Sequence, residues 1–316
     1  DQTLLRMKIT ETDTIGYSRI FRESFIPYNT PRFNLLNSYK CDNVKFLLFT
    51  EEDQIIGLIA GIEGNKLLVP FSAPYSCFSF QNNFIKTSYI LDAIKALDQY
   101  CVDNAYRYIK FTLPPTIYNE HIISKMVFGF CRNDYTVVAD DNHVFYTKDY
   151  INYEKGTIKK GVRHNVRAAS KAGLTFRKAE SIKEYKIIYD VIKTNKEVKN
   201  RKMGLSLEQI QEMNCLVDID YFLISLEEKA LASAIVYKYS SGIVQIIYWG
   251  DLPGYNSYYP MNFLAMNIFR YYYENQVDII DLGNSSNFSE PNFGLSNFKE
   301  SIGCTTTIKF TFIKKM

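Results

Sequence analysis

The stretch that decides the fold occurs twice. Residues 46–60 read Phe-Leu-Leu-Phe-Thr-Glu-Glu-Asp-Gln-Ile-Ile-Gly-Leu-Ile-Ala, and residues 222–236 read Phe-Leu-Ile-Ser-Leu-Glu-Glu-Lys-Ala-Leu-Ala-Ser-Ala-Ile-Val. Each copy is an apolar strand, an acidic turn and a second strand with small residues. The second copy begins 176 residues after the first (222 − 46 = 176). That offset is too long for a solenoid repeat and suits one domain, so the chain predicts a duplicated domain.

The elements that follow the two copies correspond in order. A third strand, an amphipathic helix and a further strand are expected at 66–71, 89–104 and 106–113 in the first half, and at 243–249, 261–275 and 277–282 in the second. The order β-β-β-α-β predicts an α/β fold with mixed, mostly antiparallel sheets flanked by helices. We expect two domains, residues 1–150 and residues 151–316.

Local signals predict the remaining elements. The first half is expected to end in a hairpin, with strands at 136–139 and 143–147 around the turn cluster at residues 140–142. A link between the halves is expected at 148–155. The other expected features are a helix over 157–172 closed by Gly173, a strand at 174–177, a helix at 181–193, a mobile basic loop at 195–204, a capping box at Ser206 and Gln209, and a strand at 305–313.

Composition predicts a soluble globular protein. The chain has 316 residues, of which 47% are hydrophobic and 22% are charged. No apolar run reaches the roughly 20 residues of a membrane helix, and the first residues lack the pattern of a signal peptide. Six scattered cysteines indicate reduced thiols, so a cytoplasmic location is expected. The three histidines lie far apart and no metal-ligand spacing occurs, so no metal site is predicted.

Positive charge is concentrated in one segment. Residues 155–178 contain eight Lys or Arg and no acid, while the whole chain carries +3, so the remainder carries −5 (3 − 8 = −5). Lys160, Arg163, Arg167 and Lys171 recur every three or four residues and share one helix face. The stripe is interpreted either as a solvated face or as a site for a phosphorylated ligand, such as a nucleotide-linked one, or for a polyanion such as tRNA.

A second group of candidate residues lies near the carboxyl end of the chain. Asp281 ends a predicted strand, and Asn284 lies in the loop that follows, where open α/β sheets place ligands. Lys299 beside Phe298 on a short helix can hold a developing oxyanion or a phosphate, whereas Lys314 in the tail is expected to be solvated. Tyr258 belongs to an aromatic cluster that could line an acceptor pocket, stack an adenine or simply form core.

Two stretches resemble the Fem-type (FemABX-like) aminoacyltransferases. Residues 163–174, Arg-His-Asn-Val-Arg-Ala-Ala-Ser-Lys-Ala-Gly-Leu, are similar to that family's basic helix. Asp281-Leu282-Gly283, Gly294-Leu295, Phe298-Lys299 and Ile302-Gly303 are similar to its closing pattern, with Ile302 in place of the usual aromatic residue. The resemblance implies two tandem GNAT domains, the fold of the N-acetyltransferases. Two departures are the missing coiled-coil insertion and the compact spacing around Lys299.

The resemblance implies transfer of an acyl or aminoacyl group to an amine of a cell-envelope precursor, a peptidoglycan precursor or an amino-sugar. The donor would be aminoacyl-tRNA or acyl-CoA, although the usual CoA-pyrophosphate pattern is absent from residues 72–86 and 250–262. Lys299 takes the electrostatic role, Phe298 packs beside it, and Asp281 is a base or orients Lys299. The alternative is a non-catalytic module that binds a nucleotide-sugar or RNA.

Overall fold

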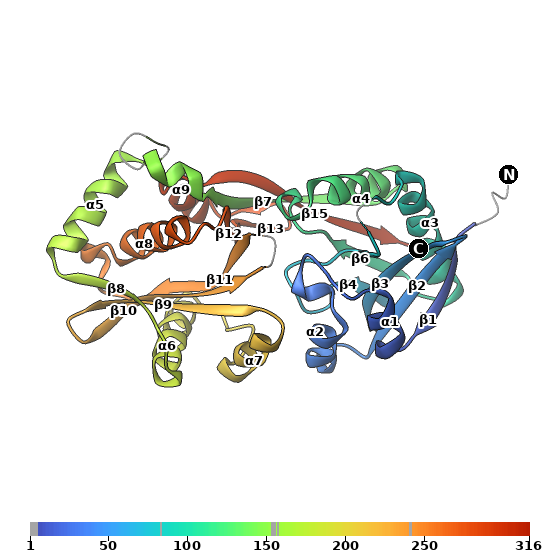
Figure 1. Ribbon diagram of the computed structural model, residues 1–316, viewed down its shortest axis with the longest axis horizontal. Helices are drawn as coiled ribbons and strands as arrows, with labels where there is room; N and C mark the ends of the chain where they lie inside the picture. The colour runs from blue at the N-terminus through green and yellow to red at the C-terminus, as the bar shows by residue number, and fades with distance from the viewer. Residues whose placement is uncertain (1–5, 83, 153–155, 157, 240–241) are drawn as a thin grey trace. The chain divides into compact units, whose positions relative to one another are not determined.

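The computed structural model describes residues 6–82, 84–152, 156, 158–239 and 242–316 (Figure 1). The chain divides into two compact units. Unit 1 contains Asp1–Asp140, Phe288–Glu290 and Ile308–Met316, and unit 2 contains Asp141–Asn287 and Pro291–Thr307. The first part of the expected link at 148–155 lies in a 3-10 helix, Thr147–Asn152. Its last part, residues 153–155, lies outside the described residues, and so does Lys155 of the basic segment.

Unit 1 is a mixed sheet with helices on both faces. Its strands run in the order β1-β2-β3-β4-β6-β15, with β5 beside β3; β4 and β6 are parallel and the other neighbours along this order are antiparallel. Figure 1 shows α3 and α4 over one face and α1 and α2 over the other. The elements are β1 Lys8–Thr12, α1 Thr14–Ile20, α2 Pro31–Leu36, β2 Asn43–Glu51, β3 Gln54–Glu63, β4 Lys66–Val69, β5 Ser79–Phe80, α3 Thr87–Asp103, β6 Tyr108–Thr112, α4 Glu120–Arg132 and β15 Thr305–Lys315.

Unit 2 repeats this plan. Its strands run in the order β8-β9-β10-β11-β12-β7, where β11 and β12 are parallel and the others are antiparallel. The elements are β7 Thr136–Tyr146, α5 Lys160–Lys171, β8 Leu174–Lys178, α6 Ile182–Val198, α7 Leu207–Glu212, β9 Asp218–Leu226, β10 Lys229–Lys238, β11 Ile243–Asp251, α8 Pro260–Glu274, β12 Ile279–Asn284, the short pair β13 Ser286–Asn287 and β14 Glu290–Pro291, and α9 Phe293–Ser301. The predicted α/β class with mixed, mostly antiparallel sheets flanked by helices is confirmed.

The two copies match in detail. Phe46 pairs with the last residue of β1, and Phe222 pairs with the last residue of β8. Each acidic turn begins with a glutamate in the left-handed region, Glu52 at φ 52° and Glu227 at φ 53°. Each central helix ends on an asparagine whose side chain donates to a tyrosine carbonyl four residues back, at 2.9 Å in α3 and 2.7 Å in α8. The same turn conformation and the same helix-end hydrogen bond at equivalent positions support the predicted duplication.

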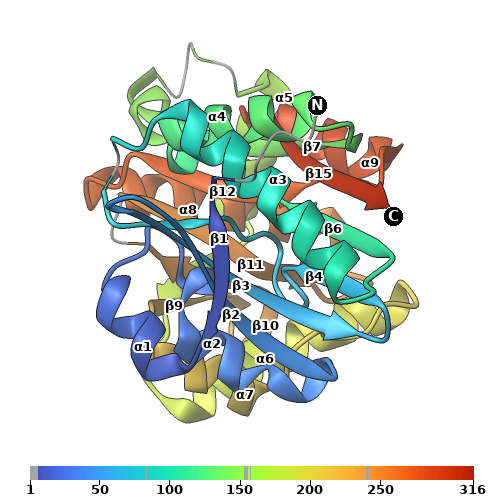
Figure 2. The same cartoon turned by 90° about the vertical axis from the view of Figure 1, so that its right-hand side faces the viewer.

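The last strands are exchanged between the two halves of the sequence. β6 of the first half pairs with β15 from the end of the chain, and β12 of the second half pairs with β7. A division at residue 150 treats each half as contiguous, whereas each unit holds the final strand of the other half. The boundary near residue 150 itself stays a prediction. Figure 2, in which the right-hand side of Figure 1 faces the viewer, shows β15 near the C-terminus, close to β6.

The predicted hairpin at 136–147 is wrong, because β7 is one continuous strand from Thr136 to Tyr146. The polar residues that suggested a turn are used by the strand itself. Asp140 accepts a hydrogen bond from the backbone of Ser289 at 3.0 Å, and Asn142 donates to Asp281 at 2.9 Å. Partners far away in the sequence therefore override the local turn preference of these residues. The expected loop at 195–204 also begins later, since α6 continues to Val198.

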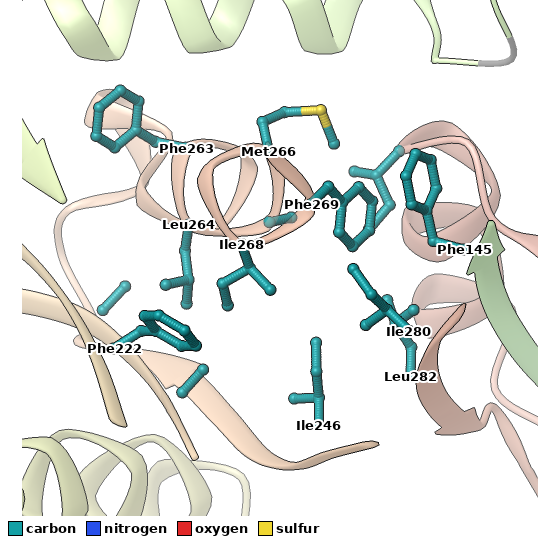
Figure 3. Close-up of a cluster of buried hydrophobic side chains, with 14 of the residues drawn as sticks. Phe145, Phe222, Ile246, Phe263, Leu264, Met266, Ile268, Phe269, Ile280 and Leu282 are labelled. Carbon is teal, nitrogen blue, oxygen red and sulfur yellow. The ribbon is translucent and has the colours of Figure 1, made fainter. Parts of the chain in front are cut away.

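The core of unit 2 lies between α8 and the sheet. In Figure 3, Leu264 and Ile268 of α8 point toward Phe222 and Ile246, and the rings of Phe145 and Phe269 stack with centroids 3.9 Å apart. These side chains are almost completely buried, which stabilises the fold by about 1.5–3 kcal/mol for each large apolar residue. α6 packs on the opposite face of β10 and β11 (Figure 1). The sheet around β11 is therefore covered on both faces and held rigidly.

Candidate functional site

The candidate site lies in unit 2, where two parallel strands separate. β11 and β12 pair from Ile243 with Ile279 to Gln245 with Asp281. β11 then continues along β10 to Asp251. We call the parts of β11 beyond Gln245 and of β12 beyond Asp281 the splay. Parallel strands present their carboxyl ends at the same edge of a sheet, where open α/β folds bind their ligands.

A β-bulge at Ile247 sets the direction of the side chains in the splay. This residue is the extra one in β11 opposite β10. Ile246, before the bulge, belongs to the core under α8, and Trp249, three residues later, packs on the same core. Tyr248 faces α6 instead, with Lys196 Nζ 5.1 Å from its ring centroid. In a regular strand, side chains alternate between the two faces, so without the bulge Tyr248 would face α8 and Trp249 would face α6. The bulge therefore turns Trp249 toward the face that α8 covers.

Two of the predicted binding residues, Phe298 and Tyr258, lie at this face. Phe298 of α9 contacts Trp249, with ring centroids 5.8 Å apart and planes inclined by 60°. Tyr258 packs against the same core from the 3-10 helix that precedes α8. Phe298, Trp249 and Tyr258 are each half-buried. They therefore present apolar ring surface next to the carboxyl ends of β11 and β12, as a ligand site requires.

Asp281 occupies the point where the strands separate, and it is fully buried. One of its carboxylate oxygens, Oδ1, accepts from Asn142 Nδ2 at 2.9 Å and from the Gly283 backbone N–H at 2.9 Å. The other, Oδ2, accepts from Gln245 Nε2 at 3.2 Å, and Gln245 in turn accepts from the Tyr239 hydroxyl at 2.6 Å. A buried carboxylate is stable only with such partners. These contacts make Asp281 a residue that holds β7, β11 and β12 in place.

Lys299 is also buried, with 1% of its surface exposed. Its ammonium donates to the carbonyl oxygens of Gly283 at 2.8 Å and Asn284 at 3.1 Å. Gly283 has φ +75°, a conformation that favours glycine, so the chain turns sharply there. The ammonium thus fixes the irregular end of β12 around Gly283, which we call the β12 turn, and holds Asn284 at the edge of the splay.

His143 on β7 is fully buried near Lys299. Its Nδ1 lies 3.1 Å from the Ser285 hydroxyl, and its Nε2 lies 3.4 Å from the Thr306 hydroxyl and 3.5 Å from that of Ser296. Burial, and secondly the charge of Lys299, lower the pKa of His143 and favour the neutral ring. The imidazole therefore joins the β12 turn, α9 and β15 through hydroxyl contacts.

Asp251 is a carboxylate at the carboxyl end of β11. Asn195 Nδ2 donates to its Oδ1 at 3.0 Å and to its backbone oxygen at 2.8 Å, and Lys199 Nζ donates to Asn195 Oδ1 at 3.0 Å. α6 approaches closely here, because a Cβ on Gly250 would lie 2.8 Å from Asn195. Burial raises the pKa of Asp251, although Lys199 opposes the shift. A carboxylate with a raised pKa is a stronger base.

The basic segment forms α5, as predicted, and Gly173 after it is left-handed at φ +91°. Val162 and Ala169 are buried, while Lys160, Arg167 and Lys171 are exposed on the opposite face. Two hydrogen bonds fix α5 beside the site. The Lys159 N–H donates to the Ser301 carbonyl of α9 at 3.0 Å, and Asn165 Nδ2 donates to Asn262 Oδ1 of α8 at 3.1 Å.

Arg163 differs from the other basic residues of α5. It is half-buried, and its guanidinium donates to the Ile158 carbonyl. Its contact therefore supports the start of α5. The structure brings Asp281, Asn284, Phe298 and Lys299 together around the β12 turn, and it ties α5 to α9 nearby. Their roles in binding and catalysis stay predictions.

Asp251 and His143 are residues of the candidate site that no sequence pattern indicated. The expected strand at 243–249 stopped two residues short of Asp251, and the spacing rule for metal sites set His143 aside. Among the described residues, no group of three or more His, Cys, Asp or Glu side chains could hold a metal ion. In the same part of the chain, no helix is long and apolar enough to cross a bilayer.

Comparison with known proteins identifies the fold. No protein-family model matches the chain, and no curated protein matches it in sequence. FemX is similar in structure, with 9% identity, a TM-score of 0.64, and coverage of 98% of this chain and 97% of that one. L-PGS from Bacillus licheniformis has 14% identity, a TM-score of 0.60, and coverage of 96% and 93%. A tandem GNAT protein from the clavulanic acid biosynthesis pathway has 7% identity, a TM-score of 0.53, and coverage of 98% of both chains.

At these identities the similarity establishes the fold alone. The chain has a Fem-like tandem GNAT fold, as its two copies of the strand-turn-strand stretch and its closing motif predicted. The chemistry that this fold performs here must be argued from the splay and its residues.

Proposed function

We propose that the protein is an N-acyltransferase that transfers an acyl or aminoacyl group to an amine. The observation that carries the proposal is the splay, because it places a carboxylate, main-chain donors and aromatic walls at the carboxyl ends of β11 and β12. The ladder between these strands ends at Gln245, so main-chain N–H groups further along β11 are suited to a developing oxyanion. Acyl transfer between bound reactants needs these groups and no covalent enzyme intermediate.

In the proposed reaction, the acceptor amine attacks the acyl carbonyl of a thioester or ester. The new N–C bond forms, the C–S or C–O bond of the donor breaks, and the leaving group takes the electron pair. The amine must lose a proton, and Asp251 is the carboxylate at the β11 end that receives it, because burial raises its pKa. A neutral amine is required since an ammonium has no lone pair.

Lys299 and Asp281 enter the proposal as positioning residues. Both are buried and both bond to the β12 turn, through the carbonyls of Gly283 and Asn284 and through the Gly283 N–H. Their contacts hold Asn284 at the edge of the splay. Phe298 and Tyr258 contribute apolar surface to the bound substrate.

The basic face of α5 points to a phosphorylated substrate. Lys160, Arg167 and Lys171 are exposed on a helix that contains no acid and is bonded to α8 and α9. We propose a nucleotide-linked acceptor, and the resemblance to Fem-type enzymes favours an amine of a cell-envelope precursor, on peptidoglycan or an amino-sugar. Aminoacyl-tRNA and acyl-CoA are the donors to test. Both donors are anionic, so the stripe could serve either substrate.

The test is a product screen by mass spectrometry with aminoacyl-tRNA or acetyl-CoA as donor and UDP-linked muropeptides or amino-sugars as acceptor. Asp251→Asn should lower kcat by about 10²–10⁴ without weakening binding, because general-base catalysis contributes on that order. Asp190→Asn, an exposed carboxylate of α6, is the control. Equal turnover in both variants would remove Asp251 from the mechanism.

Binding is tested separately with Lys160→Glu together with Arg167→Glu. Arg163 is left in place because its bond to the Ile158 carbonyl would mix folding with binding. Each lost phosphate contact should lower the salt slope of binding by roughly one unit. The exposed pair Lys183→Glu and Lys186→Glu on α6 is the control. Binding of a nucleotide-sugar or RNA without any product, from every donor tested, would favour the binding module instead.

A further inference from the structure

A groove between α1 and α2 of unit 1 has no role in the proposed reaction. It measures about 730 Å³, and its walls include Ile15, Arg19, Arg22, Arg32 and Leu35. Ile15 is 61% exposed and Leu35 is 48% exposed, which is high for side chains of their size. The groove therefore combines apolar surface with guanidinium groups on one outer face of the unit.

The inner faces of the two helices are already used in the core, so the groove is built from their outer faces. Tyr17 of α1 is fully buried, with its ring 5.8 Å from that of Phe46, and Phe33 of α2 packs 5.0 Å from Tyr28. Ile15 and Arg19 lie four positions apart on α1 and therefore share a face, and Arg22, just after the end of α1, lines the same groove. The groove is a consequence of how α1 and α2 dock.

Both helices are fixed at their starts, so the groove is formed in advance. The Asp13 carboxylate accepts from the Gly16 N–H at 2.7 Å and caps α1. Thr30 caps α2 by accepting from the Phe33 N–H at 3.4 Å, and Asn34 donates to the carbonyl oxygens of Tyr28 and Thr30 at 2.9 Å each. Caps of this kind typically stabilise a helix by about 1 kcal/mol each.

The charges of the groove are one-sided. Residues 14–36 contain three arginines and one glutamate, Glu23, which gives a net charge of +2. Among the described residues, no side chain makes an ion pair or hydrogen bond with Arg19, Arg22 or Arg32. All three are exposed. By contrast, Lys45 on the neighbouring strand β2 pairs with Glu11 at 2.8 Å.

Arginines beside exposed aliphatic side chains match the boundary layer of an anionic membrane. The guanidinium groups pair with lipid phosphates, and the aliphatic groups enter the region between headgroups and acyl chains. A soluble phosphate would use the arginines but would leave Ile15 and Leu35 in water. We propose that this groove docks unit 1 onto a surface of anionic phospholipid. The proposal concerns unit 1 alone and is independent of the transferase chemistry assigned to unit 2.

The test is flotation of the full chain with lipid vesicles. Vesicles containing roughly 30 mol % phosphatidylglycerol should bind the protein, and vesicles of phosphatidylcholine alone should bind it far more weakly. Arg22→Glu with Arg32→Glu should lower the affinity by at least about 25-fold, since each arginine near an anionic surface contributes roughly fivefold. Ile15→Ser with Leu35→Ser should lower it by about tenfold or more while leaving the net charge unchanged.

The matched control is Arg107→Glu with Arg132→Glu, which makes the same change of net charge on exposed residues of unit 1 outside the groove. Its affinity should stay within about fivefold of the native protein. Circular dichroism and melting temperature establish that every variant is folded. The proposal is overturned if the native protein does not bind anionic vesicles. It is likewise overturned if the groove variant, Arg22→Glu with Arg32→Glu, and the control variant lose affinity equally. It is also overturned if inorganic phosphate at constant ionic strength displaces the protein, which would indicate a site for free phosphate.

Discussion

Replacing Lys299 by methionine tests how the β12 turn is held. Methionine keeps the length and the apolar stem of the side chain but removes the ammonium that donates to Gly283 and Asn284 at 2.8 and 3.1 Å. Hydrogen bonds to a charged donor contribute about 1.5–3 kcal/mol each, so the gross loss is about 3–6 kcal/mol. Methionine avoids the desolvation of a buried charge, which offsets part of that loss. We expect the free energy of unfolding to fall by about 2–3 kcal/mol.

The measurement combines denaturant unfolding with amide hydrogen exchange. Peptides that cover Gly283 to Asn287 should exchange faster in Lys299→Met, because the turn loses its internal donor, while peptides from unit 1 should not change. If the turn positions substrate as proposed, kcat should also fall by about 10²–10³. The control is Lys183→Met, an exposed lysine of α6, which should leave stability and exchange as they are.

Two results would refute this reasoning. Unfolding free energies that agree between Lys299→Met and Lys183→Met would mean that the two carbonyl contacts contribute nothing net. Faster hydrogen exchange throughout unit 2, with no preference for the β12 turn, would mean that Lys299 stabilises the core in general and does not act on the β12 turn. In that case Asn284 would lose its assigned position at the edge of the splay.

Two further predictions concern Lys314 and His143. Lys314→Met should destabilise unit 1, because the ammonium pairs with Asp98 at 2.7 Å and donates to the Asn133 carbonyl at 2.9 Å. The control is Lys315→Met, at an exposed neighbour, which should leave stability unchanged. Similar melting temperatures for the two variants would contradict this prediction. The lowered pKa of His143 means that the unfolded chain takes up its proton first as pH falls below the ordinary histidine value of about 6.5. Stability should therefore decline from pH 7 to pH 5 more steeply in the native protein than in His143→Gln, and parallel curves would show that His143 is not the titrating group.

The tail lysine shows where reasoning from sequence stops. Lys314 was expected to be solvated, but β15 places it against α3 and the end of α4, where Asp98 and Asn133 bind it. Nothing within a few residues of Lys314 indicates those partners, which lie 216 and 181 positions away in the chain, respectively.

The elements themselves were determined locally. The repeated strand-turn-strand stretch, the left-handed Gly173 after α5 and the capping box at Ser206 follow from the period of apolar residues and from short-range hydrogen bonds. The basic stripe of α5 follows in the same way from a 3.6-residue period. These features need no partner distant in sequence, so the amino-acid sequence was enough to predict them. The duplication of the strand-turn-strand stretch then predicted the fold.

Tertiary structure decided everything that depends on which segments meet. It made β7 one continuous strand, since Asp140 and Asn142 find partners distant in sequence that a local turn rule does not contain. It exchanged the last strands, extended β11 to Asp251, and inserted the bulge that aims Trp249 at α9. It also buried Lys299 and Asp281 as supports of one turn. Sequence patterns report the preferences of neighbours along the chain, whereas a site is built from contacts between residues far apart in it, and only the packed fold brings those together.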